Sequence, residues 1–63
     1  MISLEALLKE GTKALEEHEL QEARLDAWLL LEYVTGVTRA FYFAHSDDAV
    51  DEEKVARYRE VIE

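Results

Sequence analysis

The chain has 63 residues, no cysteine, 49% hydrophobic residues and a formal net charge of −8 at pH 7. Its length allows one domain at most, spanning residues 1–63, and its apolar content is too high for a disordered chain. The lack of cysteine excludes disulfides and thiolate metal sites. The negative charge argues against nucleic acid and anionic membrane surfaces as partners, because both select clustered Lys and Arg.

The first predicted helix covers residues 3–17. Ser3 is expected to cap its N-terminus, and Ile2 and Leu7 stand at the spacing of a hydrophobic staple. The apolar positions follow the i, i+3, i+4, i+7 rule of a helix with one buried face: Leu4, Leu7, Leu8, Gly11, Ala14 and Leu15. Gly11 costs a helix about 1 kcal/mol relative to alanine, so we expect another helix to approach closely at this position.

The second predicted helix, about residues 21–35, lies in the stretch "EARLDAWLLLEYVTG", the densest apolar run of the chain. At about 100° per residue, its apolar positions form two groups on nearly opposite sides. One group is Ala23, Ala27, Leu30, Leu31 and Val34, the other is Leu25, Leu29 and Tyr33, and Trp28 lies between them. A helix with two apolar sides is normally buried on both. We therefore expect this helix to be the central one of a bundle, with Leu30 in the core.

Charged residues and a glycine limit this second helix. Arg24, Asp26 and Glu32 interrupt the apolar run, so it cannot span a membrane, for which about 20 apolar residues are needed. Gly36 follows the last apolar position and suits a left-handed C-terminal cap. Asp26 is assigned a structural role, because its carboxylate can stabilise the helix N-terminus or pair with Arg24 or Arg39.

Two shorter helices complete the predicted fold. Thr38 is expected to cap a helix over "RAFYFAH", residues 39–45, and a loop follows at residues 46–51. Asp51 is then expected to cap the fourth helix. The inward stripe of that helix consists of Val55, Tyr58 and Ile62. The final stretch "ARYREVIE" has no glycine, proline or other stop signal, which indicates a domain excised from a longer chain.

The sequence contains no arrangement typical of an active site. It has no glycine-rich phosphate loop, no calcium-loop spacing and no Ser/His/Asp order that indicates a nucleophile. His18 and His45 lie in polar contexts without ligand-spaced neighbours and are expected to be ordinary surface residues. We therefore expect no catalytic residue, no cofactor and no metal in this chain. The N-terminus lacks the basic start and the small-residue cleavage site of a signal peptide, so we expect the cytoplasm as its location.

The aromatic run "AFYF" is a candidate partner surface. Phe41, Tyr42 and Phe43 span about 200° of a helix, so one small core cannot hold all three and at least one is expected to face outward. Tyrosine and phenylalanine are enriched at protein interfaces, although single exposed aromatic residues are also normal. Arg39 and Tyr42 are the candidate partner-binding residues.

The stretch "ARLDAWLLLEYVTG" followed by "VTR" resembles the N-terminal domain of the HemK/PrmC-type release factor glutamine methyltransferases. The shared positions are Arg24, the Asp26–Ala27 pair, the leucine run Leu29–Leu31, Val34 with Gly36, and Arg39. The opening "LEALLKEGTKALEE" is also similar to the family's first helix, so the resemblance covers essentially the whole chain. Trp28 departs from the pattern, which has a glutamate or another polar residue there, and leaves the exposure of that helix face open.

The resemblance implies a non-catalytic domain of a larger enzyme. In that family, a small helical bundle precedes a Rossmann-like domain, which binds S-adenosylmethionine and methylates the glutamine of the GGQ motif in peptide-chain release factors. The NPPY motif and the glycine-rich cofactor loop belong to that later domain, so no catalytic or cofactor-binding residue carries over to this chain. The implied partners are the release factor and the catalytic domain in cis. An acidic bundle can attract a basic surface on such a factor.

The sequence therefore predicts an all-α bundle of four helices, or five if a loop adds a turn, with residues 21–35 as its central helix. The favoured function is recognition of the release factor. The alternative is a free-standing acidic interaction module, or a homodimer that buries "AFYF" and the second helix; a bundle used as a folding model would have the same fold. A following segment with a glycine-rich loop after a strand and an NPPY motif would favour the methyltransferase over the alternative.

Overall fold

The computed structural model describes residues 1–19 and 21–62 of the chain. Its helices are α1 (Leu4–Glu17), α2 (Ala23–Thr35), α3 (Arg39–His45) and α4 (Glu52–Ile62). Within these two described ranges there is no β-strand, only one isolated bridge between Ser3 and Ala49. The predicted all-α bundle of four helices is confirmed. Glu63, the last residue of the predicted chain ending, lies outside the described residues.

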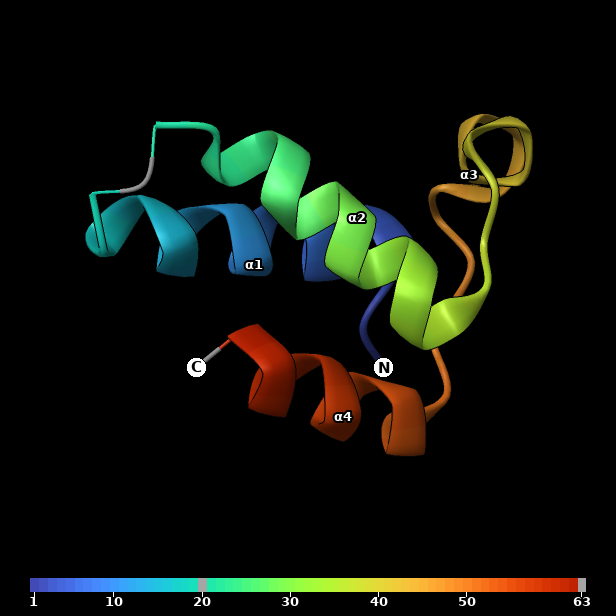
Figure 1. Cartoon of the computed structure of the whole chain (residues 1–63). Coiled ribbons are helices and arrows are strands. Elements are labelled where there is room, and N and C mark those ends of the chain that lie inside the picture. Colours follow the sequence, from blue (N-terminus) through green and yellow to red (C-terminus); the bar gives the residue numbers. More distant parts are fainter. Residues whose placement is uncertain (20, 63) are drawn as a thin grey trace.

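The three long helices form the body of the bundle (Figure 1). α1, α2 and α4 contact one another in every pairing, and α3, seen almost end-on at the right of the figure, is set off from them and joined to the C-terminal end of α2 by a short connection. α2 therefore touches both of the other long helices, as expected of a central helix. Among the described residues, no helix combines the length and the apolar character that crossing a bilayer requires.

The core lies between the three long helices. Leu7 of α1, Leu31 of α2 and Tyr58 of α4 are fully buried. The other buried apolar residues are Leu4, Leu8, Leu15, Ala23, Ala27, Trp28, Val50, Val55 and Ile62. Burying one large apolar side chain contributes about 1.5–3 kcal/mol to folding. The inward stripe predicted for the fourth helix is confirmed, and that of the first helix is confirmed except at Ala14, which is only partly buried.

The prediction that α2 is buried on both sides is wrong. Leu25, Leu29 and Tyr33 are 43%, 53% and 74% exposed, so the second apolar side of the helix faces solvent. Leu30, predicted to lie in the core, is only partly buried, whereas its neighbour Leu31 is fully buried. The reason is geometric, because α1 and α4 cover one side and α3, with seven residues, is too short to cover the other.

The predicted helix caps are confirmed. The side chains of Ser3, Thr38 and Asp51 each accept a hydrogen bond from a backbone N–H two or three residues further along, at 3.1 to 3.2 Å. Gly36 adopts the left-handed conformation with φ of 73°, and its N–H donates to the carbonyl oxygen of Glu32. Only glycine adopts this backbone conformation without strain, so Gly36 ends α2 where the sequence predicts.

The loop between α3 and α4 holds the start of α1. The backbone N–H of Leu4 donates to the carbonyl oxygen of Asp48 at 3.0 Å, and the N–H of Glu5 donates to the carbonyl oxygen of Ser46 at 2.9 Å. These bonds satisfy N–H groups that the first turn of a helix leaves unpaired. They also fix the loop to a segment that is distant in the sequence.

A bidentate ion pair joins α1 to α4 at the surface. The guanidinium of Arg59 donates to both carboxylate oxygens of Glu10, at 2.7 and 2.9 Å. These hydrogen bonds hold the pKa of the Glu10 carboxyl below its usual value. Because both side chains remain about half exposed, solvent screens the pair and its contribution to stability is small.

Tyr58 links the three long helices at one point. Its hydroxyl donates a hydrogen bond to the carbonyl oxygen of Ala27 at 2.8 Å. Its ring lies against Gly11, where an added Cβ would stand 2.8 Å from Cε2 and Cζ and would overlap the hydroxyl oxygen. The close approach predicted at Gly11 is therefore confirmed, and the tyrosine of α4 is the group that needs the space.

Burial of Tyr58 predicts a loss of stability in alkali. Burial, aided by the nearby Glu10 carboxylate, raises the pKa of Tyr58 to about 12 from an ordinary value of 10.0. As pH rises, the Tyr58 hydroxyl therefore loses its proton in the unfolded protein before it does so in the folded protein. The stability that buried, protonated Tyr58 contributes is complete below pH 10 and is lost as pH rises through about 12. Urea unfolding at a series of pH values in this range measures the free energy of unfolding of the unchanged protein and of Tyr58→Phe. We expect the difference between the two to shrink as pH rises. A constant difference would show that Tyr58 ionises equally in both states.

Candidate functional site

A hollow with arginines at its edge opens between α1, α2 and α3. It has a volume of about 370 Å³. Its lining residues are Leu8, Arg24, Leu25, Trp28, Arg39, Tyr42 and Phe43, and we call it the arginine hollow. The two residues predicted to bind a partner, Arg39 and Tyr42, thus lie in one place. Their binding role remains a prediction.

Aromatic side chains form a connected row along this hollow. Trp28 of α2 meets Tyr42 of α3 edge to face, with ring centroids 5.4 Å apart, and Tyr42 meets Phe43 at 6.0 Å. Trp28 is buried, whereas Phe43 is 79% exposed, so the row runs from the core to the surface. The guanidinium of Arg39 lies 5.6 Å from the centre of the Trp28 ring, within the range of a cation–π interaction.

Trp28 also explains how the short α3 is attached. The sequence left the exposure of this face of α2 open. The structure buries Trp28 to 7% exposure and uses it as the platform for Tyr42 and Arg39, both from α3. A small polar residue at this position could not supply the same apolar and aromatic contacts. Trp28 therefore positions both predicted partner-binding residues.

The structural role assigned to Asp26 remains a prediction. Asp26 is partly buried in the first turn of α2, where the helix dipole favours a negative charge. No ion pair or side-chain hydrogen bond of Asp26 is present among the described residues. The predicted alternative, pairing with Arg24 or Arg39, is therefore not found, and both arginines remain available at the hollow.

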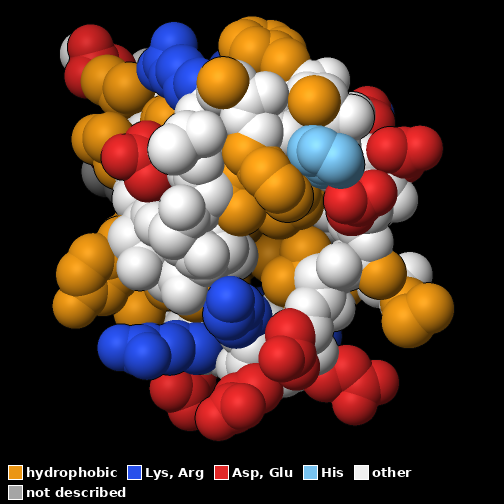
Figure 2. All heavy atoms as spheres, turned by 90° about the vertical axis from the view of Figure 1, so that its right-hand side faces the viewer, with side chains coloured by type: hydrophobic (Ala, Val, Ile, Leu, Met, Phe, Trp, Pro, Cys, Tyr) orange, Lys and Arg blue, Asp and Glu red, His pale blue; other side chains and the backbone are white. Residues whose placement is uncertain are grey.

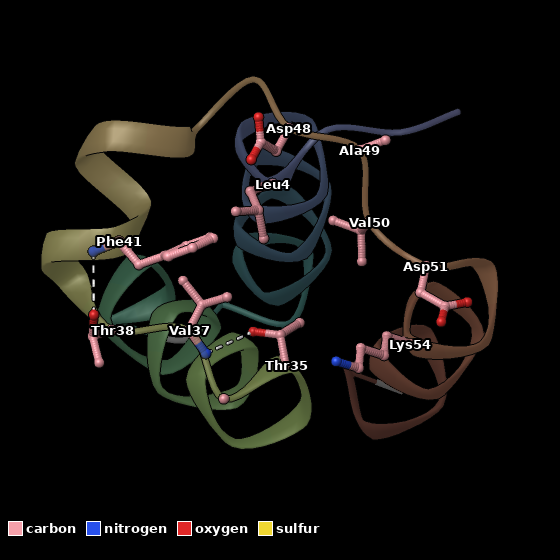
Figure 3. A pocket seen from close by; sticks show the side chains of 11 residues that line it. Leu4, Thr35, Val37, Thr38, Phe41, Asp48, Ala49, Val50, Asp51 and Lys54 are labelled. Atoms are coloured by element: carbon pink, nitrogen blue, oxygen red, sulfur yellow. Dashed lines mark hydrogen bonds between the residues drawn. The ribbon is translucent and has the colours of Figure 1, made fainter.

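A second hollow, of about 510 Å³, opens between the segment that joins α2 to α3 and the segment that joins α3 to α4. We call it the loop hollow. Figure 3 shows apolar side chains such as Leu4, Val37 and Val50 pointing into it, with Asp51 and Lys54 at one side. The view of this face in Figure 2 shows an apolar centre with both acidic and basic groups gathered along its edges. Its mixed charge selects neither sign of partner, so the loop hollow is the weaker candidate.

The charge of the arginine hollow is more selective. A smaller hollow of about 240 Å³, lined by Leu8, Lys9, Thr12 and Arg24, adjoins it through the shared Leu8 and Arg24. Together the two linings contain three cationic side chains and no carboxylate. This is notable in a chain with 15 acidic and 7 basic residues. The arrangement fits a negatively charged group with an apolar side chain beside it.

Histidines and acidic residues are the side chains of this chain that could hold a metal ion. No group of three His, Asp or Glu side chains able to hold a metal ion occurs in residues 1–19 and 21–62. His18 is exposed at the C-terminal cap of α1. His45, also exposed, lies 3.0 Å from Asp48 and stacks on Phe41. Both histidines are thus on the surface, as predicted.

Sequence reasoning named only Arg39 and Tyr42 of the seven residues that line the arginine hollow. Arg24, Leu25 and Phe43 all line it, but Leu25 was assigned to a buried helix side and Phe43 was one of three candidates to face outward. The spacing of Arg24 and Trp28, four residues apart on one helix, was the available signal, because such residues share a face. The packing of α3 against this face of α2 follows from no local pattern in the sequence.

Comparison with known protein families identifies the chain. Residues 6–63 match the PrmC N-terminal domain, so the match covers α2, α3 and α4 and all but the first two residues of α1. No curated protein and no solved structure gives a significant match. The family match agrees with the resemblance read from the Asp-Ala pair, the leucine run and the glycine that ends α2. The chain therefore belongs to the PrmC N-terminal domain family.

Proposed function

We propose that this chain is the non-catalytic N-terminal domain of a release factor glutamine methyltransferase. Its role is to help bind and position the release factor whose GGQ glutamine receives a methyl group from S-adenosylmethionine. The observation that carries the proposal is the family match over residues 6–63. The reaction itself belongs to a catalytic domain outside this chain.

The surface of the bundle supports a binding role. The arginine hollow combines exposed apolar area with cationic groups, which is the composition of a protein interface centre with a polar rim. Arg39 and Tyr42 are held in place by contacts with Trp28, so they are ordered before a partner arrives. Ordered contact residues lower the entropy cost of association.

The open side of α2 supports contact with a second partner. Leu29 and Tyr33 do not line the arginine hollow, stand four residues apart and are both exposed, so they form one apolar row along the helix. We assign this row to the catalytic domain in cis. The rival occupant is a second copy of the chain, which matches the alternative of a free-standing homodimer.

Titration calorimetry of the chain against a purified release factor tests the proposed function. We expect binding at physiological ionic strength with a dissociation constant on the order of 10 μM, because a single small domain offers only a small interface. Sedimentation velocity of the chain alone, run first, shows whether it is a monomer. No heat of binding from a monomeric chain with a helical circular dichroism spectrum would contradict the proposal. A stable dimer that ignores the release factor would favour the rival.

A further inference from the structure

We propose that the arginine hollow takes an acidic segment of the release factor that also carries an aromatic or aliphatic side chain. Carboxylates of this segment pair with Arg24 and Arg39, and its apolar side chain packs between Leu25 and Phe43 over Trp28. This inference rests on the proposed function for the identity of the partner. It adds the site on this chain and the chemistry that the site recognises.

Charge selects the sign of the occupant. Among the described residues, the arginine hollow and the smaller hollow beside it are lined by the cationic side chains of Lys9, Arg24 and Arg39 and by no carboxylate. Lys9 is already engaged, with its ammonium 3.4 Å from the carboxylate of Glu5. Arg24 and Arg39 make no ion pair within the described residues, so their guanidinium groups are free to bind carboxylates, which arginine does in a bidentate manner.

The apolar walls select a polypeptide over a simple anion. Leu25 and Phe43 are 43% and 79% exposed, and the floor between them is the buried ring of Trp28. Exposed aromatic side chains beside arginines are the composition of energetic centres in protein interfaces. An inorganic anion would leave this apolar area uncovered, whereas a segment with one large side chain covers it.

Net charge argues against a nucleic acid as the occupant. Arginine and aromatic side chains together also bind single-stranded nucleic acids. The chain as a whole carries a formal charge of −8, which repels a phosphate at every nucleotide, while two free arginines neutralise only a short stretch. A segment with two or three carboxylates presents fewer charges to the acidic remainder of the chain, so it is the favoured occupant.

The single tryptophan provides a direct measurement. Trp28 is the only tryptophan in the chain and lines the hollow, so a ¹⁵N-labelled sample has one indole N–H resonance, which unlabelled partner tryptophans cannot obscure. We expect unlabelled release factor to shift or broaden this resonance at physiological ionic strength. Release factor that binds and leaves the resonance unchanged would overturn the site and leave the proposed function standing.

Charge reversal with a matched control tests the chemistry. The double variant Arg24→Glu and Arg39→Glu is expected to weaken binding about tenfold or more. Lys54→Glu with Arg57→Glu changes the net charge equally on α4, away from the hollow, and is expected to change the dissociation constant less than about twofold. Equal losses in the two double variants would mean that only total charge matters, which overturns the inference.

A third variant separates binding from folding. Phe43→Ser removes the most exposed wall of the hollow, and at 79% exposure the side chain contributes little to the core, so the circular dichroism spectrum should not change. We expect it to weaken release factor binding severalfold. Unchanged affinity would overturn the apolar part of the proposal. An indole shift with a uridine oligonucleotide, together with no binding of the release factor, would overturn both this inference and the proposed function.

Discussion

Leu31→Ala is expected to destabilise the protein by about 2–5 kcal/mol, whereas Leu29→Ala is expected to cost less than about 0.5 kcal/mol. The two leucines lie in the same apolar run of α2, two positions apart. Leu31 is fully buried between the long helices, and Leu29 is 53% exposed. Removing the first leaves a cavity in the core, while removing the second leaves none. Urea unfolding followed by circular dichroism at a single temperature measures both values.

The size of the domain decides how this comparison is made. A chain this small has only about 3–5 kcal/mol of total stability, so Leu31→Ala approaches complete unfolding. A fixed concentration of sucrose, which favours the compact state, keeps all variants measurable. Leu30→Ala, at a partly buried position, should fall between the other two. If Leu29→Ala costs as much as Leu31→Ala, the second side of α2 is covered in solution and the exposed row is wrong.

The features that were predictable are those that depend on neighbours in the sequence. Ser3, Thr38 and Asp51 cap their helices because their side chains reach N–H groups two or three residues away, and Gly36 ends α2 through its own backbone conformation. The buried stripes of α1 and α4 follow from helical periodicity. For each of these, the physical cause lies within one or two turns of the chain.

The features that were not predictable depend on how many helices are available to cover each surface. Periodicity correctly gives α2 two apolar sides, but it does not count covering elements, so the exposure of Leu25, Leu29 and Tyr33 was missed. The same limit applies to the loop that pairs with the start of α1 and to the Glu10–Arg59 ion pair. Each joins segments that are distant in the sequence.

The candidate site falls between these two cases. Arg39 and Tyr42 were named because an aromatic run on a short helix cannot be buried entirely, which is a local argument. Their neighbours Arg24 and Leu25 come from α2, and only the packing of α3 onto Trp28 brings the two helices together. The α3 side of the hollow was thus within reach of sequence reasoning, and the contribution of Arg24 to its charge was not.

Gly11→Ala has the second large expected effect, and here two effects oppose each other. Alanine improves the helix propensity of α1 by about 1 kcal/mol. The new Cβ would overlap the hydroxyl of Tyr58 and stand 2.8 Å from two of its ring carbons. Tyr58 is fully buried and is held by its hydrogen bond to Ala27, so a shift of its ring would disturb the core and this hydrogen bond. We expect the steric cost to win, with a net destabilisation of about 1–3 kcal/mol.

A double-mutant cycle identifies Tyr58 as the cause. Tyr58→Phe removes the hydroxyl oxygen that the new Cβ would overlap most, so Gly11→Ala should cost less in that background than in the unchanged protein. The expected coupling is at least about 0.5 kcal/mol, since the two residues are in contact. Gly36→Ala is the control, because no atom lies within 4 Å of the added Cβ and its cost comes only from the φ of 73°; its effect should be the same in both backgrounds. If Gly11→Ala stabilises the protein, α1 and α4 can separate at this point without loss, and Tyr58 does not fix their distance.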